Sequence, residues 1–105
     1  MKKLIIPVAL ALAATISSAG PSGAMLLDSL KSPDRYSQGV AMGYIQGVLD
    51  LRQGLEFCLT PQASLGQVRE AVEHWLDINP FLTKYNAYAT ISFAVANSWP
   101  CGAKL

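Results

Sequence analysis

Three glycines spaced four residues apart, Gly39, Gly43 and Gly47, interrupt a run that otherwise has helical spacing. Each glycine inside a helix costs about 1 kcal/mol relative to alanine, so the three together cost about 3 kcal/mol. On a helical wheel they form a seam between an apolar half and a polar strip that holds Gln46 and Asp50. Such a seam allows another helix to approach closely. We predict that it packs either against the last helix of the same chain or against a second copy, which would make a homodimer.

Two helices have clear ends in the sequence. The glycine helix is expected to begin with Ser32 as its N-cap and to end near Gly54, a residue suited to a C-terminal cap. Ser64 and Gln67 have the spacing of a capping box, which predicts the start of a second helix. This helix has an apolar and a charged face, and Asn79 followed by proline ends it.

Two further helical segments complete the expected fold. A last helix is predicted over about residues 86–98, and residues 25–32 allow one short helical turn. No run alternates between apolar and polar residues as strands do. We therefore predict an all-α protein, a small helical bundle of three main helices with a possible short helix before them.

The N-terminus has the pattern of a secretory signal peptide. Lys2 and Lys3 precede an apolar run over residues 4–16 and a small-residue cleavage site ending at Ala19. Cleavage after Ala24 is a second possibility, and an uncleaved membrane anchor is the alternative interpretation. The run is shorter than the roughly 20 residues that span a bilayer. We expect residues 1–19 to be removed, with no membrane contact afterwards.

The remaining chain is expected to form one domain. Residues 20–24 are rich in glycine and small residues, so we expect residues 20–31 to be flexible or partly helical and residues 32–105 to form a single helical domain. Without Lys2 and Lys3, six basic and seven acidic residues remain. This balance offers no basic patch for nucleic acid.

The two cysteines, Cys58 and Cys101, are expected to form a disulfide, because small exported domains often need a covalent cross-link. A metal site would need more ligands than these cysteines and the single histidine, His74, supply. No cofactor is indicated either. His74 is also the only candidate base for nucleophilic catalysis, and it lies on a charged helix face where a solvated histidine is the ordinary outcome. The sequence therefore argues against an enzyme.

The charged face of the second helix and the segment after it form a candidate protein-binding surface. Acidic, basic and aromatic side chains come together there, and such side chains often carry interface energy. The alternatives are that the charged residues are simply solvated and that Phe81 and Leu82 cover the core. The candidate partner-binding residues are Glu70, Glu73, His74, Asp77, Lys84 and Tyr85.

Several motifs resemble those of the Rap/Tai immunity proteins of type VI secretion systems. They are "MGYIQGVLD" at residues 42–50, "FCLTPQASLGQVREAVEHWLDINP" at 57–80 and "SWPC" at 98–101. The residues that match the family motifs are Gly43, Tyr44, Gly47, Asp50, Cys58, Pro61, Pro80, Trp99, Pro100 and Cys101. Many members carry a further cysteine before the glycine–tyrosine pair, whereas this chain has Ala41 and Met42 there.

This resemblance implies a small helical protein of the bacterial periplasm that binds a peptidoglycan amidase toxin and blocks its active site. It identifies the glycine helix as scaffold and transfers no toxin-contacting residue. A periplasmic holdase chaperone is the second hypothesis, because loss of charge at Glu70, Glu73 and Asp77 in acid could expose apolar surface. An adaptor subunit of an envelope complex is the third.

Overall fold

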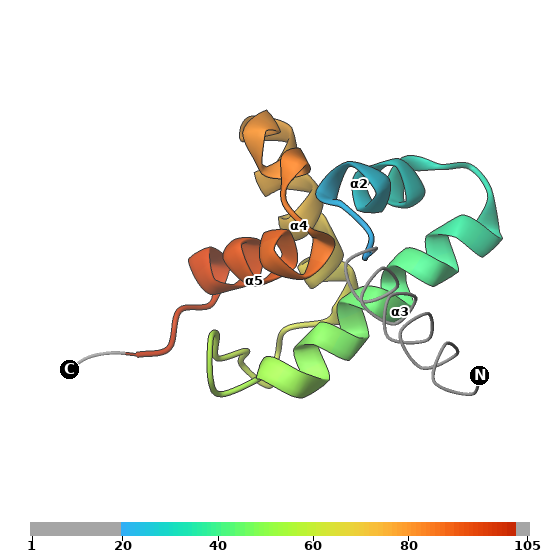
Figure 1. The fold of residues 1–105 in the computed structure, drawn as a ribbon. Helices are drawn as coiled ribbons and strands as arrows, with labels where there is room; N and C mark the ends of the chain where they lie inside the picture. Colours follow the sequence, from blue (N-terminus) through green and yellow to red (C-terminus); the bar gives the residue numbers. More distant parts are fainter. Residues whose placement is uncertain (1–19, 103–105) are drawn as a thin grey trace, which may run out of the picture.

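Four α-helices and one 3-10 helix make up residues 20–102, the part of the chain that the structure, a computed structural model, describes (Figure 1). They are α2 (Gly23–Lys31), α3 (Arg35–Arg52), α4 (Leu65–Ile78), η2 (Pro80–Lys84) and α5 (Ala87–Ser98). No strand occurs in this range, so the all-α prediction is confirmed. Within the same residues, no helix is both long and apolar enough to span a bilayer. The predicted signal peptide lies outside the described residues.

The helix α2 is a full part of the bundle and packs against α3, α4, η2 and α5 (Figure 1). Leu26 and Leu30 are buried in the core. The start of α2 and the residue two positions before it are held by backbone hydrogen bonds. Gly23 N donates to the Tyr85 carbonyl over 2.7 Å, and Ala87 N donates to the Pro21 carbonyl over 2.8 Å. The expectation of a flexible start followed by one helical turn therefore underestimated the length of this helix. A nine-residue helix occupies this segment and contacts each of the other helices described.

The core lies between the helices, and every helix contributes to it. Its fully buried large side chains come from α2, α3, the loop after α3, α4 and α5: Leu30, Ile45, Phe57, Val68, Val72, Leu76, Ile91 and Val95. Phe57 fixes the loop between α3 and α4, because its ring is fully buried although the loop itself has no regular structure.

Local hydrogen bonds at the helix starts confirm one prediction, the capping box, and correct another, the N-cap of α3. Ser64 and Gln67 form the expected capping box at α4. Asn86 caps α5 by accepting from Ala89 N over 2.8 Å. The cap of α3 is Asp34, which accepts from Ser37 N, whereas Ser32 ends α2. The prediction of Ser32 as this N-cap was wrong because α2 extends up to Lys31, so Ser32 follows it directly.

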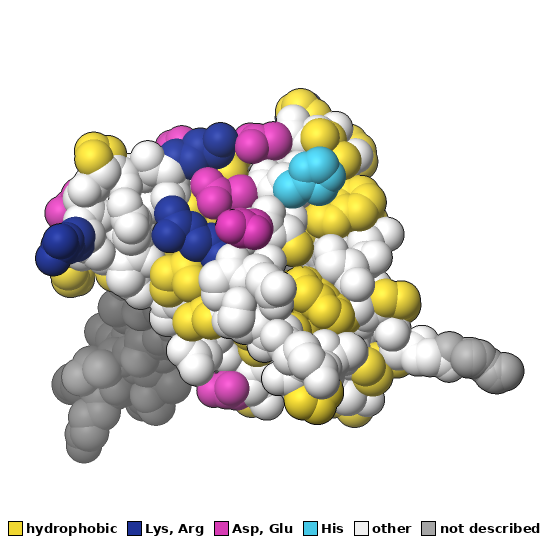
Figure 2. Space-filling view, turned by 180° about the vertical axis from the view of Figure 1, so that it is seen from behind, with side chains coloured by type: hydrophobic (Ala, Val, Ile, Leu, Met, Phe, Trp, Pro, Cys, Tyr) yellow, Lys and Arg dark blue, Asp and Glu magenta, His cyan; other side chains and the backbone are white. Residues whose placement is uncertain are grey.

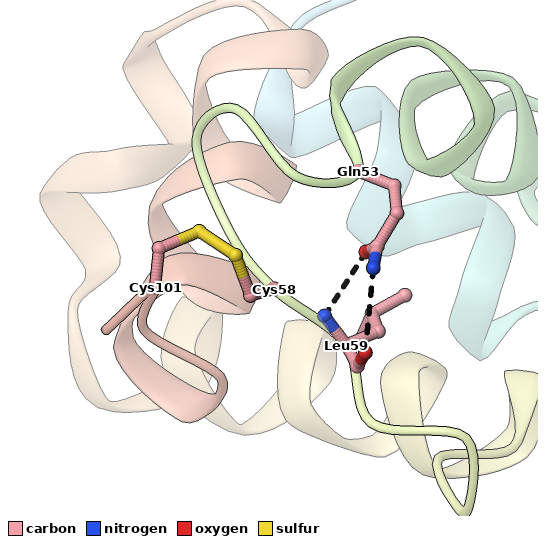
Figure 3. The surroundings of a disulfide bond; sticks show 4 residues. All are labelled: Gln53, Cys58, Leu59 and Cys101. Carbon is pink, nitrogen blue, oxygen red and sulfur yellow. Dashed lines mark hydrogen bonds between the residues drawn. A yellow bond between two sulfur atoms is a disulfide. The ribbon is translucent and has the colours of Figure 1, made fainter. Parts of the chain in front are cut away.

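The predicted disulfide is present and joins the loop after α3 to the segment after α5 (Figure 3). The Cα atoms of Cys58 and Cys101 lie 4.7 Å apart. Cys58 N also donates to the Trp99 carbonyl over 2.9 Å. Beside the disulfide, the Gln53 side chain accepts from Leu59 N over 3.0 Å and donates to Leu59 O over 3.3 Å. The loop is therefore tied to α5 on one side and to the end of α3 on the other.

Two glycine substitutions should change stability in opposite directions. A Cβ on Gly23 would meet Leu82 O at 2.9 Å and Thr90 Cγ2 at 3.0 Å, whereas a Cβ on Gly39 would meet nothing within 4 Å. We expect Gly23→Ala to lower the free energy of unfolding by about 1–3 kcal/mol. Gly39→Ala should raise it by up to about 1 kcal/mol. Urea unfolding of both variants measures this, and equal shifts would contradict the close approach at Gly23.

Loss of the disulfide should destabilise the fold without abolishing its helices. The cross-linked cysteines are 43 residues apart in sequence, and a closed loop of this size is worth up to about 4 kcal/mol. We expect a double Cys58→Ser, Cys101→Ser variant to lose most of that stability in guanidinium unfolding compared with the oxidised protein. A loss well below about 1 kcal/mol would show that other contacts hold the loop.

Candidate functional site

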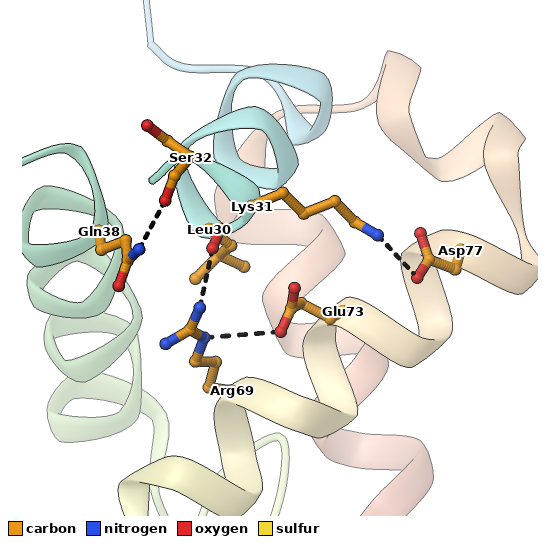
Figure 4. A network of polar contacts seen from close by, with 7 residues as sticks. All are labelled: Leu30, Lys31, Ser32, Gln38, Arg69, Glu73 and Asp77. Carbon is orange, nitrogen blue, oxygen red and sulfur yellow. Dashed lines mark hydrogen bonds and ion pairs between the residues drawn. The ribbon is translucent and has the colours of Figure 1, made fainter. Parts of the chain in front are cut away.

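Two residues on the charged face of α4, Asp77 and Arg69, contact the end of α2 (Figure 4). Lys31 Nζ lies 3.2 Å from Asp77 Oδ2, and Arg69 Nε lies 3.5 Å from Glu73 Oε1. The Arg69 guanidinium also donates to the Leu30 carbonyl over 2.8 Å, which satisfies a free carbonyl at the end of α2. Two of the predicted partner-binding residues, Glu73 and Asp77, therefore have internal partners.

The sequence did not reveal these roles, because they depend on where α2 lies. Glu73 is four residues after Arg69, so their pairing along one helix could have been expected. The Lys31–Asp77 pair joins residues 46 positions apart, and nothing in the local sequence indicates it. Glu70, in contrast, is exposed and has no hydrogen bond or ion pair within residues 20–102.

Aromatic side chains continue from the end of this charged face. The rings of His74 and Trp75 meet edge to face with centroids 6.0 Å apart, and those of Trp75 and Phe93 do so at 5.6 Å. The Trp75 indole donates to Ser98 Oγ over 3.3 Å, which joins α4 to α5. Figure 2 shows the chain's one histidine between a group of charged side chains and an area of hydrophobic ones.

We call Ile78, Phe81, Tyr85 and Phe93 the aromatic face. All four are large apolar or aromatic side chains at the end of α4, on η2 and its C-cap, and on α5, and between 40% and 58% of each is exposed. Leu82 is buried, so it does cover the core as the alternative interpretation held. That interpretation was wrong for Phe81, which is 54% exposed. Exposed aromatic groups of this kind are typical anchors of protein interfaces.

A small apolar pocket lies within the aromatic face. It has a volume of about 250 Å³ and is lined by Leu82, Tyr85, Ala89, Thr90 and Phe93. The Thr90 hydroxyl donates to the Ala87 carbonyl over 2.9 Å, so it presents no free donor to the pocket. Ligand pockets in proteins have volumes of about 300 Å³ or more. This pocket is therefore better suited to an apolar side chain of a partner than to a small-molecule ligand.

The predicted partner-binding residues thus fall into two groups. Glu73 and Asp77 form ion pairs within the protein, whereas Glu70, His74, Lys84 and Tyr85 are exposed and form none within residues 20–102. Tyr85 lines the pocket, and His74 reaches the same area through Trp75. Lys84 is exposed next to Tyr85 and has no ion pair within the described residues. Phe93 and Ile78 were missed, since helical spacing alone assigns the apolar residues of a helix to the core.

The glycine seam of α3 is exposed. A Cβ on Gly39, Gly43 or Gly47 would meet nothing within 4 Å, so the prediction that the last helix of the same chain crosses this seam was wrong. The bundle contacts α3 from the other side, through Ala41, Ile45, Val48 and Leu49. We call Tyr36, Val40 and Leu51, together with Gly43 and Gly47, the α3 face. The three large residues of this face are 79%, 53% and 76% exposed.

A larger groove separates the end of α3 from the start of α4, but its lining does not form a catalytic site. It has a volume of about 400 Å³, and Asp50 is the one ionisable residue that lines it. Among residues 20–102, no three or more His, Cys, Asp or Glu side chains come together as a metal site would need. Neither cysteine is a free thiol.

One polar cluster joins the loop after α3 to α5. The Tyr88 hydroxyl donates to Glu56 Oε2 over 2.7 Å, and the Arg52 guanidinium lies over the Tyr88 ring, 5.4 Å from its centroid. The Tyr88 hydrogen bond lowers the pKa of the Glu56 carboxyl below its ordinary value of 4.5, and the nearby Ser92 hydroxyl and Arg52 lower it further. A carboxylate that ionises this easily is a poor proton donor near neutral pH. We therefore interpret the cluster as a structural contact between the loop and α5.

Tyr88→Phe should make the stability of the fold less dependent on pH. Because the folded pKa of Glu56 lies below its unfolded value, the pair stabilises the fold above about pH 4.5 and loses this effect as the pH falls through the folded pKa. We expect the stability difference between wild type and Tyr88→Phe in urea unfolding to be largest near neutral pH and to shrink in acid. Tyr85→Phe, which removes an exposed hydroxyl, is the control and should show no such trend.

Comparison with known proteins gives the family. No curated protein matches the chain. A family model described as Rap1a immunity proteins matches residues 22–101. This match begins at the cap of α2 and ends at Cys101, so it covers every helix of the bundle and the disulfide. The chain belongs to the family of Rap1a immunity proteins.

Proposed function

We propose that this protein is a periplasmic immunity protein that binds a peptidoglycan amidase toxin of a type VI secretion system and occludes its active site. Membership of the Rap1a family supports the binding of a toxin. The proposal depends above all on one observation, the aromatic face with its apolar pocket. An inhibitor of this kind acts by filling a cleft and carries out no chemistry itself.

The aromatic face has the composition of an interface centre. Interfaces gain most of their free energy from a few aromatic or arginine residues that become fully desolvated. Tyr85 and Phe93 border the pocket, Lys84 is exposed next to Tyr85, and His74 reaches Phe93 through the Trp75 ring. An apolar centre beside polar groups matches the general anatomy of protein interfaces.

The disulfide and the signal-like N-terminus support the periplasm as the site of action. Disulfides persist in oxidising compartments such as the periplasm and are rare in the cytosol. The Cys58–Cys101 bond joins two segments of irregular structure on the surface, where a reducing environment would reach it. Cell-wall amidases act in the same compartment, so toxin and inhibitor would meet there.

An amidase titration tests this function. Oxidised protein from Gly20 onward is added to the peptidoglycan amidase encoded beside its gene, and peptide release from cell-wall sacculi is followed. We expect inhibition near molar equivalence. Tyr85→Ala and Phe81→Ala should each weaken inhibition by about fivefold or more, because truncation of an interface anchor costs more than about 1 kcal/mol.

Leu55→Ala is the matched control for these variants. Leu55 is 67% exposed in the turn after α3, so its truncation removes a similar amount of apolar surface away from the aromatic face. Tyr85→Ala leaves intact the Tyr85 carbonyl that accepts from Gly23 N, so the fold should survive. Undiminished amidase activity would reject the immunity function. Suppression of aggregation of unrelated proteins in acid would instead favour the holdase hypothesis.

A further inference from the structure

We propose that the groove between α3 and α4 binds a lysine or arginine side chain of the toxin, as a second contact besides the aromatic face. This inference rests on the proposed function, because it takes the toxin as the partner. We call this surface the α3–α4 groove. It is lined by residues from the second half of α3, from the loop that follows and from the first turn of α4.

The α3–α4 groove has the size and the floor of a binding site. Its volume is about 400 Å³, whereas ligand pockets in proteins begin at about 300 Å³. Leu49 and Val68 line it and are buried, and Leu59 and Leu65 line it and are half-buried. The groove therefore has an apolar floor. The long aliphatic stem of a lysine or arginine packs well on apolar surface while its charged end stays with polar groups.

The polar groups of the groove select a positive charge. Asp50 is the one ionisable residue that lines it, and its exposed carboxylate has no hydrogen bond or ion pair within residues 20–102. Gln46 lies one turn earlier on the same side of α3, and its side-chain amide also has no hydrogen bond in this range. A carboxylate and an amide oxygen both accept hydrogen bonds, so together they suit an ammonium or guanidinium group.

The walls of the groove are fixed before a partner binds. The Gln53 side chain accepts from Leu59 N and donates to Leu59 O, which holds the loop against the end of α3 (Figure 3). Cys58, the residue before Leu59, is joined to Cys101 by the disulfide. On the other side, the capping box fixes Ser64 at the start of α4. Such a preformed groove loses little conformational freedom on binding, which favours affinity.

One toxin molecule is large enough to contact both surfaces. The groove includes Leu65 and Val68 in the first turn of α4, whereas the aromatic face includes Ile78, its last residue. At 1.5 Å per residue, these 14 residues span about 21 Å. A standard protein interface covers about 800 Å² on each partner, which is a patch roughly 30 Å across.

Variants of Asp50 test the charge. Oxidised protein from Gly20 onward is titrated against the amidase at low and at physiological salt. We expect Asp50→Asn to weaken inhibition by about fivefold or more and Asp50→Lys to weaken it further, because the second places like charges together. Both variants should also make the affinity less dependent on salt. Asp28→Asn is the matched control and should change nothing, because Asp28 is an exposed, unpaired carboxylate of α2, which does not line the groove.

Ala63→Leu tests the groove itself. Ala63 lines the groove from the loop, so a larger side chain there fills part of the space without a change of charge. We expect about fivefold weaker inhibition. Adding Asp50→Asn to this variant should weaken inhibition little further, because both changes remove the same contact. The melting temperature of every variant should stay close to that of the wild type, because Asp50 is exposed and Ala63 is half-buried.

The same titration separates this inference from the proposed function. If the wild type inhibits the amidase and either Asp50→Asn or Ala63→Leu inhibits it equally well, the groove is not a contact and this inference is overturned, while the proposed function stands. Fully additive losses in the double variant would also overturn it. A wild type that does not inhibit the amidase would reject both.

Discussion

Gly23 lies against the Leu82 carbonyl oxygen at a distance where no side chain fits, and this contact sets the position of α2. The backbone bonds from Gly23 to Tyr85 and from Ala87 to Pro21 depend on the same close approach. Once α2 is in place, Leu26 and Leu30 fill part of the core, and Arg69 donates to the Leu30 carbonyl near the end of the helix. Asp77 and Arg69 of α4, and the η2 turn with its cap Tyr85, therefore all contact the helix that this glycine begins.

The sequence predicted correctly those helix ends that are set by hydrogen bonds between residues close together in the chain. The capping box at Ser64 and the helix that ends before Pro80 are decided by residues within three or four positions, and both were found as expected. The disulfide was also predicted, because a small exported domain with two cysteines often uses them as a covalent cross-link. The position of α2 could not be predicted in this way. Its burial depends on contacts with η2 and α5, and η2 begins 49 residues after the last residue of α2.

The candidate site shows the same division. The sequence indicated the region from Glu70 to Tyr85, but it could not separate the residues that pair with other side chains of the protein from those that face solvent. Asp77 has a partner only because Lys31 lies at the end of α2. Leu82 and Phe81 are neighbours in the sequence, yet the 3-10 turn buries the first and exposes the second. The exposure of the glycine seam likewise follows from which side of α3 the other helices cover.

The disulfide encloses α4, η2 and α5 but leaves α2 and α3 outside its loop. Cross-linking restricts only the chain between the two cysteines, so it stabilises the second half of the bundle directly and the first half through packing alone. The helices α2 and α3 can therefore separate from the rest without breaking a covalent bond. We expect the protein to open in steps, with fast amide hydrogen exchange first in the N-terminal pair of helices while the cross-linked half stays protected.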